Sequence, residues 1–232
     1  MLETLNHLDQ QLLLALNALH APFWDSFMWY VSAKWTWVPM YATILYILLR
    51  NGNWRVALFT VAAIALTIAY ADQVCATWIR PAVERMRPSN LNNPISPYVH
   101  ILNGKRSGPY GFPSCHAANS FALAFLVMFL FRRRALTLFL LFWASLNSYS
   151  RIYLGVHYPG DLLAGAVVGL SGAAIIYALY RWLLSLPVVR RVLEVGEGES
   201  LFGEVKGFRS TLYVGGVTIL ALLLYSLFVF LV

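Results

Sequence analysis

Long apolar runs, separated by short polar segments, constrain this chain more than any other feature of its sequence. Of its 232 residues, 59% are hydrophobic and only 12% are charged, whereas soluble domains carry about 25% charged residues. A helix of about 20 apolar residues is long enough to cross the hydrocarbon core of a bilayer. The pattern therefore predicts an all-α fold, a polytopic membrane helix bundle that uses residues 1–232 as one domain.

The apolar runs provide for about six transmembrane helices, the last of them an extra C-terminal span. In the fifth run, Gly165, Gly169 and Gly172 recur at a spacing that lets two helices approach closely. The expected spans cover residues 27–49, 56–79, 116–131, about 134–149, 162–186 and 211–232.

The first 20 residues predict a different kind of helix. Their leucines recur every three or four residues and form one apolar face, while Asp9 and other polar residues interrupt the remaining positions. An amphipathic helix of this kind lies in the membrane interface and does not cross the bilayer. No basic stretch followed by a long apolar run precedes residue 20, so we expect no cleavable signal peptide. The leucines concerned are Leu5, Leu8, Leu12, Leu16 and Leu19.

The basic residues lie at the ends of the apolar runs. The formal net charge is +7, but in such positions lysine and arginine set the topology and contact lipid headgroups, so we expect no nucleic-acid partner. Segments 80–115 and 149–161 are separated by two crossings and therefore lie on the same side. Three consecutive arginines at 132–134 lie on the other side, which the positive-inside rule assigns to the cytoplasm. The expected location is the inner membrane, with segments 80–115 and 149–161 facing the periplasm or cell exterior.

Three polar segments gather the groups that can perform chemistry. Residues 150–161 contain Arg151, His157 and Asp161. A histidine can act as nucleophile or base, a carboxylate can orient it, and an arginine can hold an anion. Residues 80–88 and 113–116 supply further candidates, which are Arg80, Arg87, Ser114, Cys115 and His116.

These segments resemble the three signature motifs of the type 2 phosphatidic acid phosphatase superfamily. The matching patterns are Arg80-x6-Arg87-Pro88, Pro113-Ser114-x-His116 and Ser150-Arg151-x5-His157-x3-Asp161. They form a motif core over residues 80–161. Two positions depart from the family pattern, because Arg80 replaces the usual lysine and Cys115 replaces the usual glycine. The two cysteines, Cys75 and Cys115, indicate no disulfide framework.

The resemblance implies an integral-membrane phosphatase that needs no metal or other cofactor. It implies that His157 attacks phosphorus and forms a phosphohistidine, that Asp161 orients His157, and that His116 protonates the leaving group and then activates water. A phosphate group needs concentrated positive charge and oriented N–H donors. The implied phosphate-binding residues are Arg80, Arg87, Ser114, Cys115 and Arg151.

The expected substrate is a lipid phosphate or pyrophosphate in the bilayer. The candidates are undecaprenyl pyrophosphate, phosphatidylglycerophosphate, phosphatidic acid and the 1-phosphate of lipid A. A lipid phosphotransferase that uses the same phosphohistidine is one alternative. A noncatalytic lipid-phosphate transporter is another, since Asp72 and Lys34 lie within expected spans. The sequence makes no prediction of the oligomeric state.

Five further charged residues lie in or near these segments and spans. Asp72 is either a functional acid or the buried partner of Lys34 or of an arginine. Lys34 is expected to extend its amine to the membrane surface. Arg85, Lys105 and Arg106 are expected to contact solvent or lipid headgroups.

Overall fold

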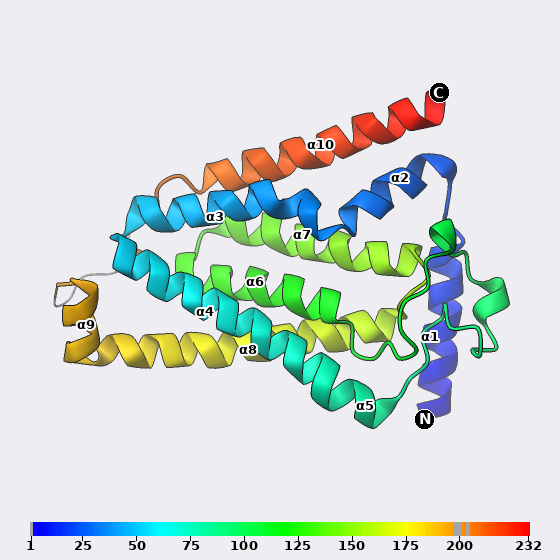
Figure 1. Ribbon diagram of the computed structural model, residues 1–232, viewed down its shortest axis with the longest axis horizontal. Helices are drawn as coiled ribbons and strands as arrows, with labels where there is room; N and C mark the ends of the chain where they lie inside the picture. The colour runs from blue at the N-terminus through cyan, green and yellow to red at the C-terminus, as the bar shows by residue number, and fades with distance from the viewer. Residues whose placement is uncertain (1, 197–200, 203–204) are drawn as a thin grey trace.

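The chain folds into a bundle of helices with one helix lying across its end (Figure 1). The computed structural model describes residues 2–196, 201–202 and 205–232. Within these ranges the regular elements are helical and none is a strand, which confirms the all-α prediction. The α-helices are α1 (Leu2–Asn17), α2 (Pro22–Val31), α3 (Val38–Asn51), α4 (Trp54–Gln73), α5 (Arg80–Val83), α6 (Cys115–Phe131), α7 (Arg134–Tyr153), α8 (Pro159–Ser185), α9 (Pro187–Leu193) and α10 (Arg209–Leu231).

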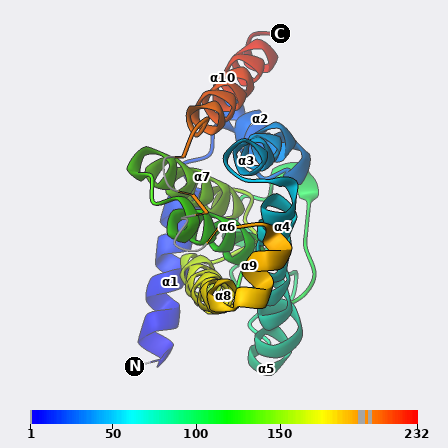
Figure 2. The same ribbon diagram turned by 90° about the vertical axis from the view of Figure 1, so that its left-hand side faces the viewer.

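Helix α6 forms the centre of the bundle. It packs against α8, α7 and α4, as the end-on view in Figure 2 shows, and α10 lies at the edge against α2 and α3. The side chains of α6 are correspondingly buried on most sides, which explains why its sequence is apolar all round. The α6 helix begins at the first residue after Ser114, so the bundle centre carries one of the polar segments at its end.

Glycines on α8 permit the close contact with α6. A Cβ at Gly165 would lie 2.5 Å from the Ser114 carbonyl oxygen, and a Cβ at Gly169 would lie 2.5 Å from that of Ala118. These separations are too short for any side chain, so the packing predicted from the glycine spacing is confirmed. The contact brings the start of α8 beside the start of α6, where the Ser114 N–H donates to the Asp161 carbonyl oxygen at 2.9 Å.

In the part of the chain that the structure describes, three helices are long and apolar enough to cross a membrane: Trp54–Val83, Pro159–Ser185 and Arg209–Leu231. The first of them includes α4, a π-helical stretch η2 (Val74–Ile79) and α5. Helix α6 is shorter but apolar. These elements match four of the expected spans, and the total of about six crossings stays a prediction.

The expected first span, residues 27–49, is not one continuous helix. Helix α2 ends at Val31, Ala33 adopts an extended conformation, and a 3₁₀ turn η1 (Lys34–Trp37) precedes α3. The Trp37 indole N–H donates to the Val31 carbonyl oxygen at 2.9 Å, which satisfies a carbonyl at the helix end. Pro39 follows at the start of α3, where its missing N–H costs nothing. The hydropathy of residues 27–49 does not predict this break.

Helix α1 lies across the ends of the other helices (Figure 1). The Asn17 side-chain amide fixes it there by donating to the carbonyl oxygens of Ile152 and Tyr153, both at 3.0 Å, and accepting from the His100 N–H at 2.8 Å. Leu13 of α1 is fully buried. Of the five leucines of the predicted apolar face, Leu5, Leu8, Leu12 and Leu19 are exposed, whereas Leu16 packs against the cluster around Leu13. The position of this helix in a membrane interface stays a prediction.

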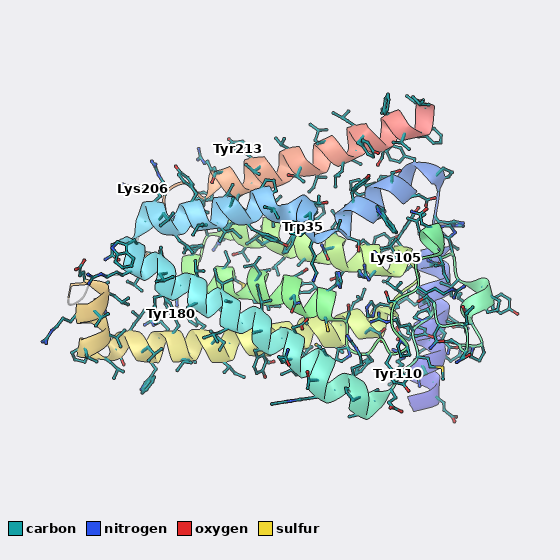
Figure 3. All side chains as sticks on the ribbon, viewed as in Figure 1. Trp35, Lys105, Tyr110, Tyr180, Lys206 and Tyr213 are labelled. Carbon is teal, nitrogen blue, oxygen red and sulfur yellow. The ribbon has the colours of Figure 1, made fainter. Side chains whose placement is uncertain are left out.

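The polar segments meet at the end of the bundle that α1 covers, which we call the site end. The loop of residues 84–114 and the segment 154–158 lie there, while the turns at 51–53 and 132–133 and helix α9 lie at the opposite end (Figure 1). Figure 3 shows Lys105 and Tyr110 at the site end and Tyr180 and Lys206 at the opposite end. The loops therefore group at two ends of the bundle as predicted, and the side of a membrane that each end faces stays a prediction. Of the acidic loop 187–210, Glu197, Glu199 and Glu204 lie outside the described residues.

Candidate active site

His157 is held on both ring nitrogens. It is buried in the segment between α7 and α8. Its Nδ1 lies 3.1 Å from Asp161 Oδ2, and its Nε2 lies 2.6 Å from Arg87 Nη1. Because a carboxylate only accepts and a guanidinium only donates, Nδ1 carries the proton and Nε2 presents its lone pair. This is the tautomer that a histidine nucleophile attacking through Nε2 requires.

The surroundings of His157 keep it neutral. Burial lowers the pKa of His157 well below its usual value of 6.5, and the positive charges of Arg87, Arg151 and Arg80 lower it further. A neutral imidazole is the nucleophilic form. The same three charges that would attract a phosphate therefore also maintain the ring in its reactive state.

Asp161 lies in the first turn of α8 and is fully buried. Its Oδ2 accepts from the Tyr158 backbone N–H as well as from His157, both at 3.1 Å. The residue therefore caps the helix and orients the histidine at the same time. The four-residue spacing between His157 and Asp161 is what places the carboxylate back against the ring.

Three arginines converge on the histidine. Arg87 Nη1 also donates to the Val156 carbonyl oxygen at 3.0 Å. Arg80 Nη2 donates to the Pro113 carbonyl oxygen and to Cys115 Sγ, both at 3.0 Å. Arg151, in the last turn of α7, donates to the Ser32 hydroxyl in the break between α2 and η1. All three act electrostatically on His157.

Each of these arginines has one hydrogen-bond donor without a partner. The Nε atoms of Arg80, Arg87 and Arg151 are buried and lack a hydrogen-bond acceptor. A buried donor without a partner costs about 1–3 kcal/mol. Burial and the neighbouring Arg80 lower the pKa of Arg87 to about 10, so Arg87 stays charged near neutrality. A tetrahedral oxyanion, with several acceptor oxygens, is the kind of ligand that would satisfy three such groups together.

The start of α6 adds N–H donors. The Ser114 hydroxyl accepts from the Ala117 N–H at 3.5 Å and serves as the N-cap of the helix. Cys115 and His116 occupy the first turn, where backbone N–H groups point out of the helix end and the helix dipole favours an anion. The side chain of Cys115 is turned toward Arg80, as the hydrogen bond between them shows.

His116 faces a cavity. It is only partly buried, and it lines a space of about 530 Å³ together with Ser32 and Lys34. The positive charge of Arg151 is close enough to act on it. His116 thus lies beside the same cluster as the nucleophile candidate, on the side that opens to this cavity.

The two charged residues within expected spans also line this cavity. Lys34 is exposed and is one of the lining residues, and the extension of its amine to the membrane surface stays a prediction. Asp72 accepts from the Asn119 side-chain amide at 3.2 Å, so its partner is neither Lys34 nor an arginine. Within the described ranges, no group of three or more His, Cys, Asp or Glu side chains is placed to hold a metal ion.

Sequence reasoning missed two residues of the site and misplaced one. Arg85 was expected at solvent or lipid, but it donates to Asp161 Oδ1 at 3.0 Å and pairs with Asp9 Oδ2 at 2.7 Å. Gly111 packs so closely that a Cβ there would lie 3.0 Å from Asp161 Oδ2. The only signal for Arg85 was its place inside the first motif. Asp9 was visible only as a polar interruption of the N-terminal helix.

Comparisons with known proteins agree with this arrangement. The family model described as the PAP2 superfamily matches residues 56–185. A protein named lipid A 4'-phosphatase from Bacteroides thetaiotaomicron is 48% identical over 230 residues, which are 98% of this chain and 99% of that protein. A protein of the same name from Porphyromonas gingivalis is 36% identical over 187 residues, which are 78% and 79% of the two chains.

A solved structure shares the fold. The crystal structure of Aquifex aeolicus LpxE superposes with a TM-score of 0.56 at 23% sequence identity and covers 72% of this chain and 93% of that one.

Proposed function

Because the chain belongs to the PAP2 superfamily and is a membrane lipid phosphatase, we propose that it removes the 4'-phosphate of lipid A through a phosphohistidine on His157. The observation that carries the mechanism is a neutral, buried histidine whose Nε2 accepts from Arg87, with Arg80 and Arg151 close enough to act on it electrostatically and with an unpaired, buried Nε donor on each of the three arginines. The names of the two curated relatives supply the substrate.

In the first step the phosphate monoester enters among Arg80, Arg87 and Arg151. The His157 Nε2 lone pair, which accepts from Arg87 in this structure, attacks phosphorus. The bond between phosphorus and the sugar oxygen breaks, and His116 protonates the departing alkoxide. Asp161 stabilises the positive charge that develops on the imidazole, as carboxylate partners of histidine do.

In the second step water replaces the alcohol. His116, now neutral, accepts a proton from water, whose oxygen attacks the phosphohistidine. The bond between phosphorus and Nε2 breaks, and His157 returns to its neutral tautomer as inorganic phosphate leaves. The arginines stabilise the charge on the phosphoryl oxygens in both steps, where one oriented donor typically contributes roughly 10²- to 10³-fold in rate.

The cavity beside His116 supports a lipid substrate. Its wall continues from Ser32 and His116 onto apolar residues of two helices. A lipid could therefore place its phosphate near the arginines while an apolar chain follows this wall toward the bilayer. The apolar lining residues that belong to these two helices are Tyr41, Ile44, Leu45 and Leu48 of α3, and Val61, Ile64 and Ile68 of α4.

The choice among lipid phosphates rests on the relatives. Sequence reasoning named the 1-phosphate of lipid A together with three other lipids, whereas both curated relatives are named for the 4'-phosphate. We also propose that the site end faces the periplasm of the inner membrane. The arginine-rich turn between α6 and α7 then lies in the cytoplasm, in agreement with the positive-inside rule.

The test is phosphate release by the purified protein from each candidate lipid in EDTA. We expect lipid A to be the best substrate, with mass spectrometry locating the lost phosphate at the 4'-position. Recovery of phosphate on a lipid acceptor instead of in solution would identify a phosphotransferase. The His157→Ala variant should be inactive, and His7→Ala, which alters an exposed histidine of α1, should match the wild type. Activity in His157→Ala would refute the mechanism.

A further inference from the structure

A chain of charged groups connects the N-terminal helix to the nucleophile. Asp9 of α1 pairs with Arg85 at 2.7 Å, and Arg85 pairs with Asp161 at 3.0 Å. Asp161 in turn holds His157 at 3.1 Å. The four side chains belong to α1, to the loop after α5, to α8 and to the segment before α8. Asp9 and Asp161 lie 152 positions apart in the sequence. The fold brings them together, and Arg85 connects them.

Arg85 is placed to act on both carboxylates at once. Its side chain is 19% exposed, that of Asp9 is 14% exposed and that of Asp161 is fully buried. One guanidinium nitrogen reaches each acid, and the guanidinium carbon lies 4.0 Å from the centre of the Tyr158 ring. Tyr158 itself is buried. The arginine is thus fixed by two ion pairs and a cation–π contact, which a residue that only contacts solvent would not need.

Asp9 also contacts the start of α8 directly. Its Oδ1 accepts from the Gly160 N–H at 2.8 Å, next to Asp161 in the sequence. A Cβ at Gly160 would lie 2.6 Å from Asp9 Oδ2, so glycine is needed for this approach. The carboxylate of Asp9 therefore spans Arg85 and the backbone of the first turn of α8.

We propose that Arg85 and Asp9 are positioning residues of the phosphatase reaction, acting on His157 through Asp161. A buried carboxylate needs a cation to stay charged, and Arg85 supplies it. Asp9 fixes the orientation of Arg85 and tethers α1 over the site. This inference rests on the proposed roles of His157 and Asp161, and it makes α1, the helix that lies across the site end, part of the active centre.

The test compares kcat and KM of Arg85→Gln, Asp9→Asn and the double variant. Outer partners of a functional histidine typically contribute 10- to 100-fold, so we expect Arg85→Gln to lower kcat by roughly this factor and Asp9→Asn by about 3- to 10-fold, with KM changed less than about twofold. Because Asp9 acts through Arg85, the double variant should be no slower than Arg85→Gln. Arg85→Lys, which keeps the charge without the fork, should recover part of kcat.

The pH dependence of kcat separates positioning from folding. The charged or titratable groups around Asp161 are Arg85 and Arg87 of the long loop, His157 and Tyr158 of the segment before α8, and Asp9 of α1, which shares Arg85 with it. Removing the Arg85 charge makes Asp161 easier to protonate, so the acidic limb of the profile should move to higher pH in Arg85→Gln. A variant that is only less stable keeps the wild-type profile.

Asn17→Ala is the matched control. Asn17 docks the same helix but touches none of the charged groups. It should lower the thermal midpoint while kcat stays within about threefold. The proposal is overturned if the losses in Asp9→Asn and Arg85→Gln multiply, if the acidic limb does not move, or if Asn17→Ala slows kcat as much as Asp9→Asn. These outcomes leave the proposed function intact, because that function depends on the inactivity of His157→Ala.

Discussion

The two histidines of the site have opposite surroundings. His157 is 2% exposed and has a partner on each ring nitrogen. His116 is only partly buried and faces a cavity of about 530 Å³. The difference matches the tasks we propose for them. A nucleophile benefits from one fixed orientation, whereas a group that protonates a leaving group and then activates water needs access to both.

The local sequence explains the difference. His157 lies in a tight connection between α7 and α8, one turn before Asp161, and Arg87 closes over it from the long loop. His116 instead occupies the first turn of α6, where the helix start leaves its side chain beside the break between α2 and η1. The proposed roles can therefore be separated experimentally, because each histidine can be changed without removing the other's contacts.

The largest effect is expected for His157→Ala. Loss of the nucleophile should lower kcat by on the order of 10⁴-fold or more, as loss of the nucleophile does in other covalent enzymes. The loss should be the same with a lipid phosphate and with an aryl phosphate, because both require the phosphohistidine. Steady-state phosphate release measures it. A loss confined to the lipid substrate would show that His157 recognises the lipid and does not attack phosphorus.

His116→Ala should give a loss that depends on the leaving group. General acid catalysis contributes typically 10²- to 10⁴-fold, so we expect a decrease in this range with the lipid. An aryl oxide leaves without a proton, so formation of the phosphohistidine from an aryl phosphate should stay fast while its hydrolysis is slow. A burst of aryl alcohol followed by slow turnover, with acid-labile phosphate on the protein, is the expected signature. Equal losses in the burst and in turnover would contradict the proposed role.

Arg151→Gln should have the next largest effect. One oriented donor to a transferred phosphoryl group contributes roughly 10²- to 10³-fold, and we expect kcat/KM to fall by that factor. The matched variant Ser32→Ala removes only the hydroxyl that holds Arg151 and should cost no more than about 10-fold. Kinetics with lipid A as substrate measure both. If Ser32→Ala were as damaging as Arg151→Gln, the serine and not the arginine would be the important contact.

Short-range patterns predicted much of this molecule. The helical character of the apolar runs, the close packing at Gly165 and Gly169 and the meeting of the motif segments at one end all followed from the sequence. The pairing of His157 with Asp161 followed from their spacing within the third motif. These features depend on residues close in sequence or on the parity of membrane crossings, which is why they were accessible.

What the sequence did not predict depends on contacts between distant segments. The pairs Asp9–Arg85 and Ser32–Arg151 join residues 76 and 119 positions apart. The break at Ala33 was not predicted, although Ser32 and Lys34 flank it, because the apolar residues on either side still make up a run long enough for a span. In each of these places a polar group is satisfied by a partner that only the folded bundle supplies, so neither periodicity nor composition carries the information.

The smallest expected effect is on how the free energy of unfolding changes with pH, which depends on the histidines His157 and His100. Burial lowers the pKa of His157 below its ordinary value of 6.5, so below that pH the unfolded chain binds a proton that the folded chain does not. Stability is therefore complete above about pH 6.5 and falls as the pH drops, by up to about 1.4 kcal/mol per pH unit for one such group. Burial also lowers the pKa of His100, which adds to the slope.

His157→Asn should reduce this slope without abolishing it. The variant cannot bind the proton in the unfolded state, so its thermal midpoint in detergent should fall less than that of the wild type between pH 7 and pH 5. His7→Asn, at an exposed position of α1, is the control and should follow the wild type. A wild-type slope in His157→Asn would mean that the folded protein accepts the proton at His157. The nucleophile would then be charged in acid, and burial would not be what keeps His157 neutral.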